Sequence, residues 1–306
     1  MSTEKMKSAP TAIPLVFENA YLQIHFCVLL WGFTAILGKL ISLAAIPLVF
    51  WRLLIVSLCL LFWPPVWRRL AGVCRRDLAV SMGAGVLITL HWLSFYGAIK
   101  LSNASVGVAS IALAPMFLSF VEPYLLRQPF VNREVLLALA SIPGVILVVG
   151  GIPSGMLAGF GLGILSALFV AIFSLVNKRL TMRVPALALT AIEIGTGVVL
   201  LGALIPAWPS LGVAFALPGR EDLAWLLILS VGCTLLPFAL SMVALRKISA
   251  FSAQLAVNME PVYAIVIATT LLGESKQLQW PFYLGVVLIL GSVLINARQH
   301  RPGGPP

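Results

Sequence analysis

The sequence predicts an all-α integral membrane protein in which ten transmembrane helices form two inverted five-helix repeats. Three observations lead to this fold class. The chain is 60% hydrophobic and only 10% charged. It contains ten apolar runs of about the length that crosses a bilayer. Patterns in its first half also return in its second half, which indicates a duplicated unit.

The composition places most of the chain in lipid. A soluble globular protein carries roughly 25% charged residues, and a chain of 306 residues with a mean hydropathy of +1.06 has too few to cover a surface in water. The net charge of +10 is in principle compatible with nucleic-acid binding. The basic residues, however, stand in short clusters between apolar runs, as in membrane proteins. We therefore expect contact with membrane lipid and no nucleic-acid partner.

The ten predicted spans are joined by short connections, so helices adjacent in sequence are expected to pack as neighbours. The spans cover residues 23–42, 46–66, 78–99, 104–125, 133–151, 158–177, 185–206, 222–243, 251–272 and 280–297. The chain is accordingly divided into a cytoplasmic N-terminal tail (1–22), a first five-helix repeat (23–151), a second, inverted five-helix repeat (158–297) and a cytoplasmic C-terminal tail (298–306).

The distribution of Lys and Arg predicts which side of the membrane each connection occupies. With the N-terminus inside, fifteen basic residues fall on the cytoplasmic side. Four fall outside, namely Lys39, Lys100, Arg220 and Lys276. This is the bias expected of cytoplasmic loops. The first twenty residues lack the features of a cleavable signal peptide, so the first apolar run is expected to remain as a span. We predict a multi-pass protein of the cell inner (plasma) membrane with both termini in the cytoplasm.

The internal repeat is clearest over the last three helices of each half. DLAVSMGAGV at 77–86 aligns with DLAWLLILSV at 222–231, AIKLSNAS from Ala98 with ALRKISAF from Ala244, and LAP at 113–115 with MEP at 259–261. Each half contains five spans, and an odd number makes the second half enter the membrane from the opposite side. Inverted repeats of this kind build secondary transporters, whose substrate site lies near the bilayer midplane between the halves.

Five segments carry a family resemblance. They are LLWGFTAILGK (29–39), IPLVFWR (46–52), YGAIKLSNASVGVASIALAPMF (96–117), NMEPVYAIVIATTLLGE (258–274) and FYLGVVLILGSVLI (282–295). They resemble the EamA-like ten-helix members of the drug/metabolite transporter superfamily. The resemblance implies a central cavity lined mainly by the first, third and fourth helices of each half, and transport, often export, of amino acids, related metabolites or drugs. One difference between the halves matters here, since the fourth helix ends with LLGE in the second half and with LLRQ in the first, so that Gln128 stands in the place of Glu274.

Glu260 is the carboxylate of VNMEPVY, inside an apolar run. A helix that starts near residue 250 would carry it about 15 Å deep, close to the midplane. Pro261 removes a backbone N–H there and frees a carbonyl group. A carboxylate at this depth is usually functional or neutralised. Glu260 is predicted to bind a substrate ammonium group or to exchange a proton. The alternative is a protonated side chain that bonds a neighbouring helix.

His91 and Trp92 fall at a similar depth on the third helix. Histidine titrates near neutral pH, and tryptophan offers a face to a cation or an aromatic ring. A hydrogen-bonded structural His and a packing Trp fit the same pattern. Further candidate substrate-binding residues, each of which could instead be a packing residue, are Trp31, Thr34, Tyr96, Ser110, Asn258 and Tyr263.

Other ionisable residues lie within the predicted spans. Arg52, on the second helix nearer the outer face, could reach the interface or hold a substrate carboxylate. Glu193, nearer the inner face, could bond an adjacent helix, and a direct pair with Arg52 is not expected. Glu122 lies near the cytoplasmic end of its helix. The candidates for proton coupling or gating are Arg52, His91, Glu122, Glu193 and Glu260, and the candidate helix hinges are Pro115 and Pro261.

The sequence carries no signature of a metal, cofactor or catalytic site. Its four cysteines form no CxxC pair and have no His partner at ligand spacing. GFGLGILSA at 159–167 opens a span instead of following a soluble strand, so its glycines indicate close helix contacts and not nucleotide binding. Walker motifs and a nucleophile elbow are also missing. We expect no cofactor, no metal and no enzymatic activity.

The predicted function is a secondary transporter that binds a small molecule in a central cavity and exports amino-acid-like metabolites by alternating access. Export of cationic or aromatic drugs would use the same carboxylate. Two other classes fit less well, namely a membrane enzyme that uses His91 on a lipid-linked substrate and a subunit that only assembles partners. The short loops argue against the enzyme, and the inverted repeat argues against the assembly subunit. The sequence does not decide between a monomer and a homodimer.

Overall fold

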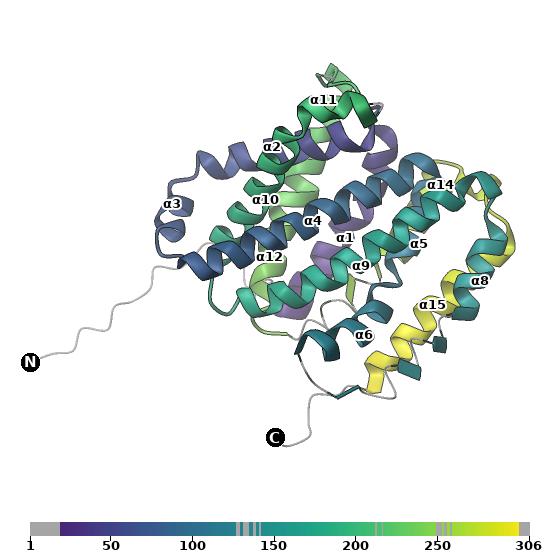
Figure 1. Ribbon diagram of the computed structural model, residues 1–306. Coiled ribbons are helices and arrows are strands. Elements are labelled where there is room, and N and C mark those ends of the chain that lie inside the picture. Colours follow the sequence, from purple (N-terminus) through teal and green to yellow (C-terminus); the bar gives the residue numbers. More distant parts are fainter. Residues whose placement is uncertain are drawn as a thin grey trace, which may run out of the picture.

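The computed structural model describes the chain over 19–126, 129–130, 135–136, 139–140, 142–211, 213–215, 217–248, 253, 256–257 and 259–299. Within these ranges every regular element is a helix (Figure 1). The all-helical fold class is confirmed.

The first repeat starts with α1 (Ala20–Leu40), where the Asn19 side chain accepts a hydrogen bond from the Tyr21 N–H at 2.9 Å and caps the helix. The helices that follow are α2 (Ala45–Leu61), α3 (Pro64–Leu70), α4 (Arg75–Leu101), α5 (Ala104–Ile111), α6 (Ala114–Leu126) and α8 (Ile142–Gly151). Pro64 begins α3, which turns by 90° from α2.

The second repeat has the corresponding series of helices. They are α9 (Leu157–Leu180), α10 (Ala186–Ala203), α11 (Arg220–Leu227), a π-helical segment η4 (Ile228–Leu235), α12 (Leu236–Ala244), α14 (Glu260–Leu271) and α15 (Trp280–Gln299). Three short 3₁₀ helices lie between them, η2 (Ser154–Met156), η3 (Ile205–Leu211) and η5 (Glu274–Lys276). In the described part of the chain α11, η4 and α12 form one continuous span.

Each of the ten predicted spans overlaps at least one of these helices, but the helices differ in length. In the described ranges six helical spans are long and apolar enough to cross a membrane, with α5 and α6 counted together as one and α11, η4 and α12 as another. The number is seven if the bent pair α2 and α3 also counts as one span. Helices α8, α14 and the described apolar part of α15 are shorter. The structure therefore confirms a multi-span helical protein, while ten full-length spans are not individually confirmed.

Hydrogen bonds between helix ends show that the two halves are inverted. At one end of the bundle, Lys100 at the end of α4 donates to the carbonyl of Ile41, just after α1. In the second repeat, Lys178 near the end of α9 donates to the carbonyl of Leu245, just after α12. The Lys100–Ile41 bond lies at the end of the bundle that holds Glu274, and the Lys178–Leu245 bond lies at the opposite end, which holds Asp77. We call these the Glu274 end and the Asp77 end.

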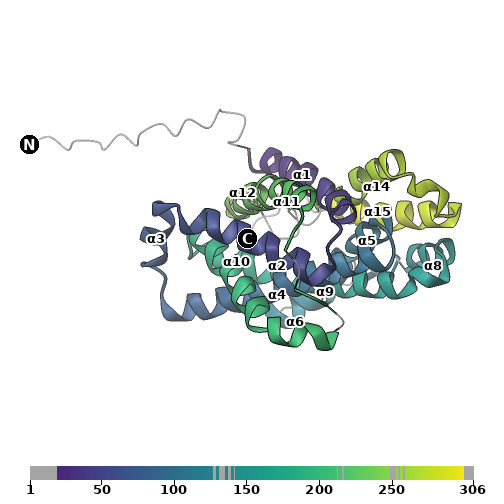
Figure 2. The ribbon, with the colours of Figure 1, turned by 90° about the horizontal axis from the view of Figure 1, so that it is seen from above.

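Helices at equivalent places in the two repeats pack against one another, α2 on α10, α5 on α14 and α8 on α15. The α8–α15 pair lies at one side of the bundle and α3 at the other (Figure 2). Glycines bring this pair together, since a Cβ on Gly144 would lie 2.8 Å from the carbonyl oxygen of Gly285. Large apolar side chains remain exposed on the outer faces, such as Phe33, Val266 and Val287, which suits a surface covered by lipid.

Candidate functional site

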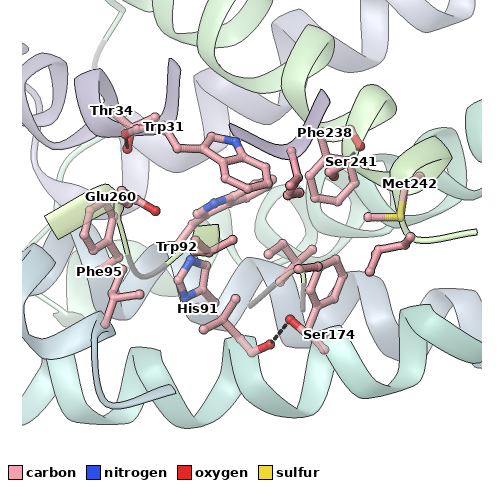
Figure 3. Close-up of a pocket in the computed structure, with 18 of the residues that line it drawn as sticks. Trp31, Thr34, His91, Trp92, Phe95, Ser174, Phe238, Ser241, Met242 and Glu260 are labelled. Carbon is pink, nitrogen blue, oxygen red and sulfur yellow. Dashed lines mark hydrogen bonds between the residues drawn. The ribbon is translucent and has the colours of Figure 1, made fainter. Parts of the chain in front are cut away.

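A cavity of about 830 Å³, part of it open to solvent, lies among α1, α2, α4, α9, α12 and α14 (Figure 3). Its aromatic wall consists of Trp31, Trp92, Phe95, Phe173 and Phe238. Its polar side chains are Thr34, Arg52, His91, Ser174, Ser241 and Glu260. An apolar cavity with a few convergent polar groups is the usual form of a small-molecule site.

Among the described residues, those that line the cavity extend toward one end of the bundle. Ile24, early in α1, and Leu245, just after α12, both line it near the Asp77 end. In the other direction the lining stops near Thr34 on α1, six residues before that helix ends at Leu40. At 1.5 Å per residue this leaves about 9 Å of packed protein before the Glu274 end.

Arg52 is held in the cavity wall by three neighbours. Its Nε donates to Thr234 Oγ1 and its Nη1 to Tyr96 Oη, both at 2.7 Å. Its guanidinium carbon lies 4.2 Å from the centroid of the Trp92 ring. The side chain is only 2% exposed. Arg52 therefore faces the cavity and does not reach the interface, and its position is fixed by hydrogen bonds and by an aromatic face.

The π-helical segment η4 explains how Thr234 reaches Arg52. Its hydroxyl donates to the carbonyl of Leu229, five residues back, at 2.6 Å, and accepts from Arg52. The backbone of this segment is π-helical, a conformation that is rare and is frequent at functional sites. Thr234 was not among the predicted site residues, because a π segment leaves no clear mark in an evenly apolar run.

Glu260 is the first residue of α14, and Pro261 the second. The carboxyl group faces the cavity and is 6% exposed. A helix N-terminus favours negative charge there, and Pro261 costs no hydrogen bond at this position. In the described part of the chain the carboxyl group makes no hydrogen bond and no ion pair with Arg52, although the two charges interact electrostatically.

His91 joins α4 to α9 and also lines the cavity. Its Nδ1 lies 2.8 Å from Ser166 Oγ and 3.0 Å from the Ser166 carbonyl oxygen. The ring stacks on Phe95 with 6.0 Å between centroids. The position of His91 therefore fits both a structural and a functional role. Its Nδ1 is hydrogen-bonded to Ser166, and its side chain still borders the cavity.

Five of the predicted substrate-binding residues line the cavity, namely Trp31, Thr34, His91, Trp92 and Glu260. Tyr96 contributes indirectly by holding Arg52. Ser110 bonds the Val106 carbonyl of its own helix at 2.8 Å, and Tyr263 packs beside Gly32. Neither is part of the lining. Asn258 lies outside the described residues.

The other predicted charged residues do not line the cavity. Glu193 is fully buried between α10 and α4, beside Gly85, and in the described part of the chain neither of its carboxyl oxygens has a hydrogen bond of normal geometry. It does not pair with Arg52. Glu122 is half-buried near the end of α6. Their roles in proton coupling or gating stay predictions.

The two predicted hinge prolines both lie at helix breaks. Pro115 is the second residue of α6, after a turn at Ala112 and Leu113 that separates it from α5. Pro261 is the second residue of α14. A break permits bending, but whether these helices move stays a prediction.

A second polar site lies at the Glu274 end. The Glu274 carboxylate is 2% exposed and accepts from Ala104 N at 3.0 Å, from Ser105 N at 2.9 Å and from Ser105 Oγ at 2.7 Å. Asp222 accepts from the N–H and the hydroxyl of Ser42 at 2.7 and 2.6 Å. Both carboxylates link one repeat to the other. The sequence held one sign of this second polar site, namely that Glu274 in the second half is replaced by Gln128 at the equivalent position of the first half.

Comparisons with known proteins agree with this architecture. The model of the EamA-like transporter family matches the chain twice, over residues 19–150 and 157–298. The chain belongs to the EamA-like transporter family. This confirms the resemblance to the drug/metabolite transporter superfamily, and it identifies the chain as a membrane transporter with two EamA repeats.

Two individual proteins show the same similarity over their whole length. An uncharacterized transporter of Archaeoglobus fulgidus is 24% identical over 298 residues, which cover 93% of this EamA-like chain and 99% of the relative. A protein of known crystal structure superposes with a TM-score of 0.64 at 15% identity, over 92% of this chain and 99% of the other. The second similarity concerns the fold alone.

Proposed function

We propose that this EamA-like transporter exports small amino-acid-like zwitterions across the inner membrane by alternating access at the central cavity. The observation that carries the proposal is the pair Arg52 and Glu260. Both line one cavity, at 2% and 6% exposure, and they do not form an ion pair with each other.

A zwitterion would satisfy both charges together. Its carboxylate suits Arg52, because a guanidinium binds carboxylates in a two-pronged geometry and the other contacts of Arg52 already fix its plane. Its ammonium group suits Glu260, whose carboxyl group lines the cavity and makes no hydrogen bond within the described part of the chain. The side group would then lie against Trp92, Trp31 or Phe238.

The location of the cavity supports export. The positive-inside bias assigns the Asp77 end, with Arg68, Arg75, Arg179 and Arg246 near it, to the cytoplasm. The cavity extends toward this end. Substrate from the cytoplasm can therefore reach Glu260, while the Glu274 end is closed. The same assignment predicts that both termini are cytoplasmic.

Export of cationic drugs is the second candidate, and the aromatic wall supports it. Arg52 argues against it, since a buried arginine repels a cation in the same space. A drug exporter would gain nothing from a fixed guanidinium, whereas a carrier of zwitterions needs one charge of each sign.

The test is counterflow in proteoliposomes. Vesicles are loaded with unlabelled neutral amino acids and given a labelled one outside, for the wild type, Glu260→Gln, Arg52→Gln and the exposed control Glu221→Gln. We expect flux in the wild type and the control, and a loss of at least about tenfold in both cavity variants, since each removes a charge-assisted contact.

Competition separates the two candidate functions. The decarboxylated amine and the deaminated acid should each compete poorly with the whole amino acid, because each satisfies only one of the two charges. Equal competition by the amine alone, with Arg52→Gln fully active, would replace the zwitterion proposal by cation export. A fully active Glu260→Gln would contradict both.

A further inference from the structure

A second cavity lies at the Asp77 end, apart from the central one, between α4, α6 and α9. Its volume is about 1280 Å³, much of it open to solvent. None of the residues that line it lines the central cavity. Nothing in the transport mechanism described above uses it.

Three arginines surround the mouth of this cavity. Arg76 is the second residue of α4, Arg179 is the last but one of α9, and Arg183 lies in the turn after α9. All three side chains are exposed. Among the described residues that line it, Asp77 is the acidic one, and its carboxylate lies 3.9 Å from Arg183. The charge at the mouth is therefore positive, with more guanidinium groups than this carboxylate can satisfy.

The inner part of the cavity is apolar. Val80 lies one helical turn into α4 from Arg76, and Leu175 and Val176 lie about one turn into α9 from Arg179. Leu125, near the end of α6, adds a side chain that is 45% exposed. Along α4 and α9 the arginines thus lie about 5 Å nearer the end of the bundle than Val80, Leu175 and Val176, and the apolar Leu180 and Met182 line the cavity beside them.

This order matches the order of groups in a membrane lipid. We propose that the cavity binds one anionic phospholipid of the adjoining leaflet, with its phosphate at Arg76, Arg179 and Arg183 and the start of its acyl chains against Val80 and Leu125. Basic pockets between transmembrane helices bind anionic headgroups in this way, and guanidinium groups favour phosphate by two-pronged hydrogen bonds. A free phosphate ion would leave the apolar wall without a partner.

Arg183 connects this site to the contact between the repeats. Its ion pair with Asp77 joins the second repeat to the first, and the Arg183 side chain is 63% exposed. A lipid phosphate would share or take this guanidinium. Removing the Asp77 charge should therefore strengthen lipid binding, an effect that a general loss of structure cannot produce.

The test is native mass spectrometry of the purified full-length protein in detergent, titrated with phosphatidylglycerol or with phosphatidylcholine of the same acyl chains. We expect one phosphatidylglycerol to bind in preference to phosphatidylcholine. The double variant Arg179→Gln, Arg183→Gln should bind it at least about tenfold more weakly, while Asp77→Asn should bind it a few-fold more tightly.

The matched control is Arg68→Gln, Arg69→Gln, which removes two exposed arginines from α3 and leaves the cavity unchanged. Its affinity should equal that of the wild type. Equal loss in this control, or equal binding of the two lipids, would overturn the proposal in favour of diffuse attraction to the membrane surface. Displacement of the lipid by inorganic phosphate at matched concentration would overturn it in favour of a free-anion site.

Discussion

The two ends of the helical bundle are held together differently. At the Glu274 end, Glu274 and Asp222 bond Ala104, Ser105 and Ser42 across the repeats, and Asn103 Nδ2 donates to Gln277 Oε1 at 3.1 Å. At the Asp77 end, the Asp77–Arg183 contact of 3.9 Å joins the repeats. The bonds from Arg246 to Thr181 and Val184 stay within the second repeat.

The two ends can be compared at equivalent positions, because the sequence aligns Asp77 with Asp222. The two aspartates begin matching helices, α4 and α11, in inverted repeats. One accepts two short hydrogen bonds, and the other forms a long, exposed ion pair. The central cavity extends toward the end with the weaker contact. We infer that the structure is the state closed at the Glu274 end, and that in the opposite state the strong contacts form at the Asp77 end.

The largest expected effect comes from Glu274→Ala. The change leaves the Ala104 and Ser105 N–H groups at the start of α5 without their acceptor in a buried place. The free energy of unfolding should fall by about 3 kcal/mol, since hydrogen bonds to charged groups contribute about 1.5–3 kcal/mol each. Equilibrium unfolding in mixed micelles measures it.

Amide hydrogen exchange provides the control for this prediction. Protection should be lost at Ala104 and Ser105 in Glu274→Ala, and retained in part in Glu274→Gln, which keeps one acceptor and copies the residue type of Gln128. Unchanged protection at both amides would show that Glu274 does not close this end.

Asp222→Asn is expected to have an intermediate effect. An amide oxygen can still accept from Ser42, but the charge that strengthens two hydrogen bonds is gone. A loss of about 1–2 kcal/mol in the free energy of unfolding should be measured under the same conditions. An effect as large as that of Glu274→Ala would mean that the two carboxylates act as one unit.

The smallest effect is expected from Asp77→Asn at the equivalent position of the other repeat. Its partner Arg183 is 63% exposed and 3.9 Å away, so solvent screens the pair. The free energy of unfolding should change by less than about 0.5 kcal/mol. If Asp77→Asn destabilised the protein as much as Asp222→Asn, the contrast between the two ends would disappear.

Much of the fold was predictable from the sequence, because ten apolar runs and matched segments such as DLAV and DLAW determine span positions and inversion. It was less predictable which side chains point into the bundle and which point toward the lipid. Lipid and protein interior are equally apolar, so a membrane helix shows little periodicity to reveal its inner face. Ser110, which bonds its own helix, and Arg52, which turned out to line the cavity, illustrate this.

The polar contacts at the helix ends were even less predictable. Glu274 stands in a connection between spans, where a carboxylate is normally solvated, and its partners are about 170 residues away in the chain. Only the assembled bundle brings the start of α5 next to it. Glu260, by contrast, was predictable, because a carboxylate beside a proline in an apolar run is costly wherever that run packs.

Thiol labelling at Ser174 tests directly whether the central cavity opens at the Asp77 end, on the cytoplasmic side. This residue lines the central cavity and lies six residues before α9 ends at the Asp77 end. A Ser174→Cys variant with Cys27, Cys59, Cys74 and Cys233 replaced by Ser would be treated with a membrane-impermeant maleimide in inside-out and right-side-out vesicles. We predict labelling from the cytoplasmic side and protection from the outside. Labelling from the outside alone would contradict the account, because the cavity would then open at the Glu274 end.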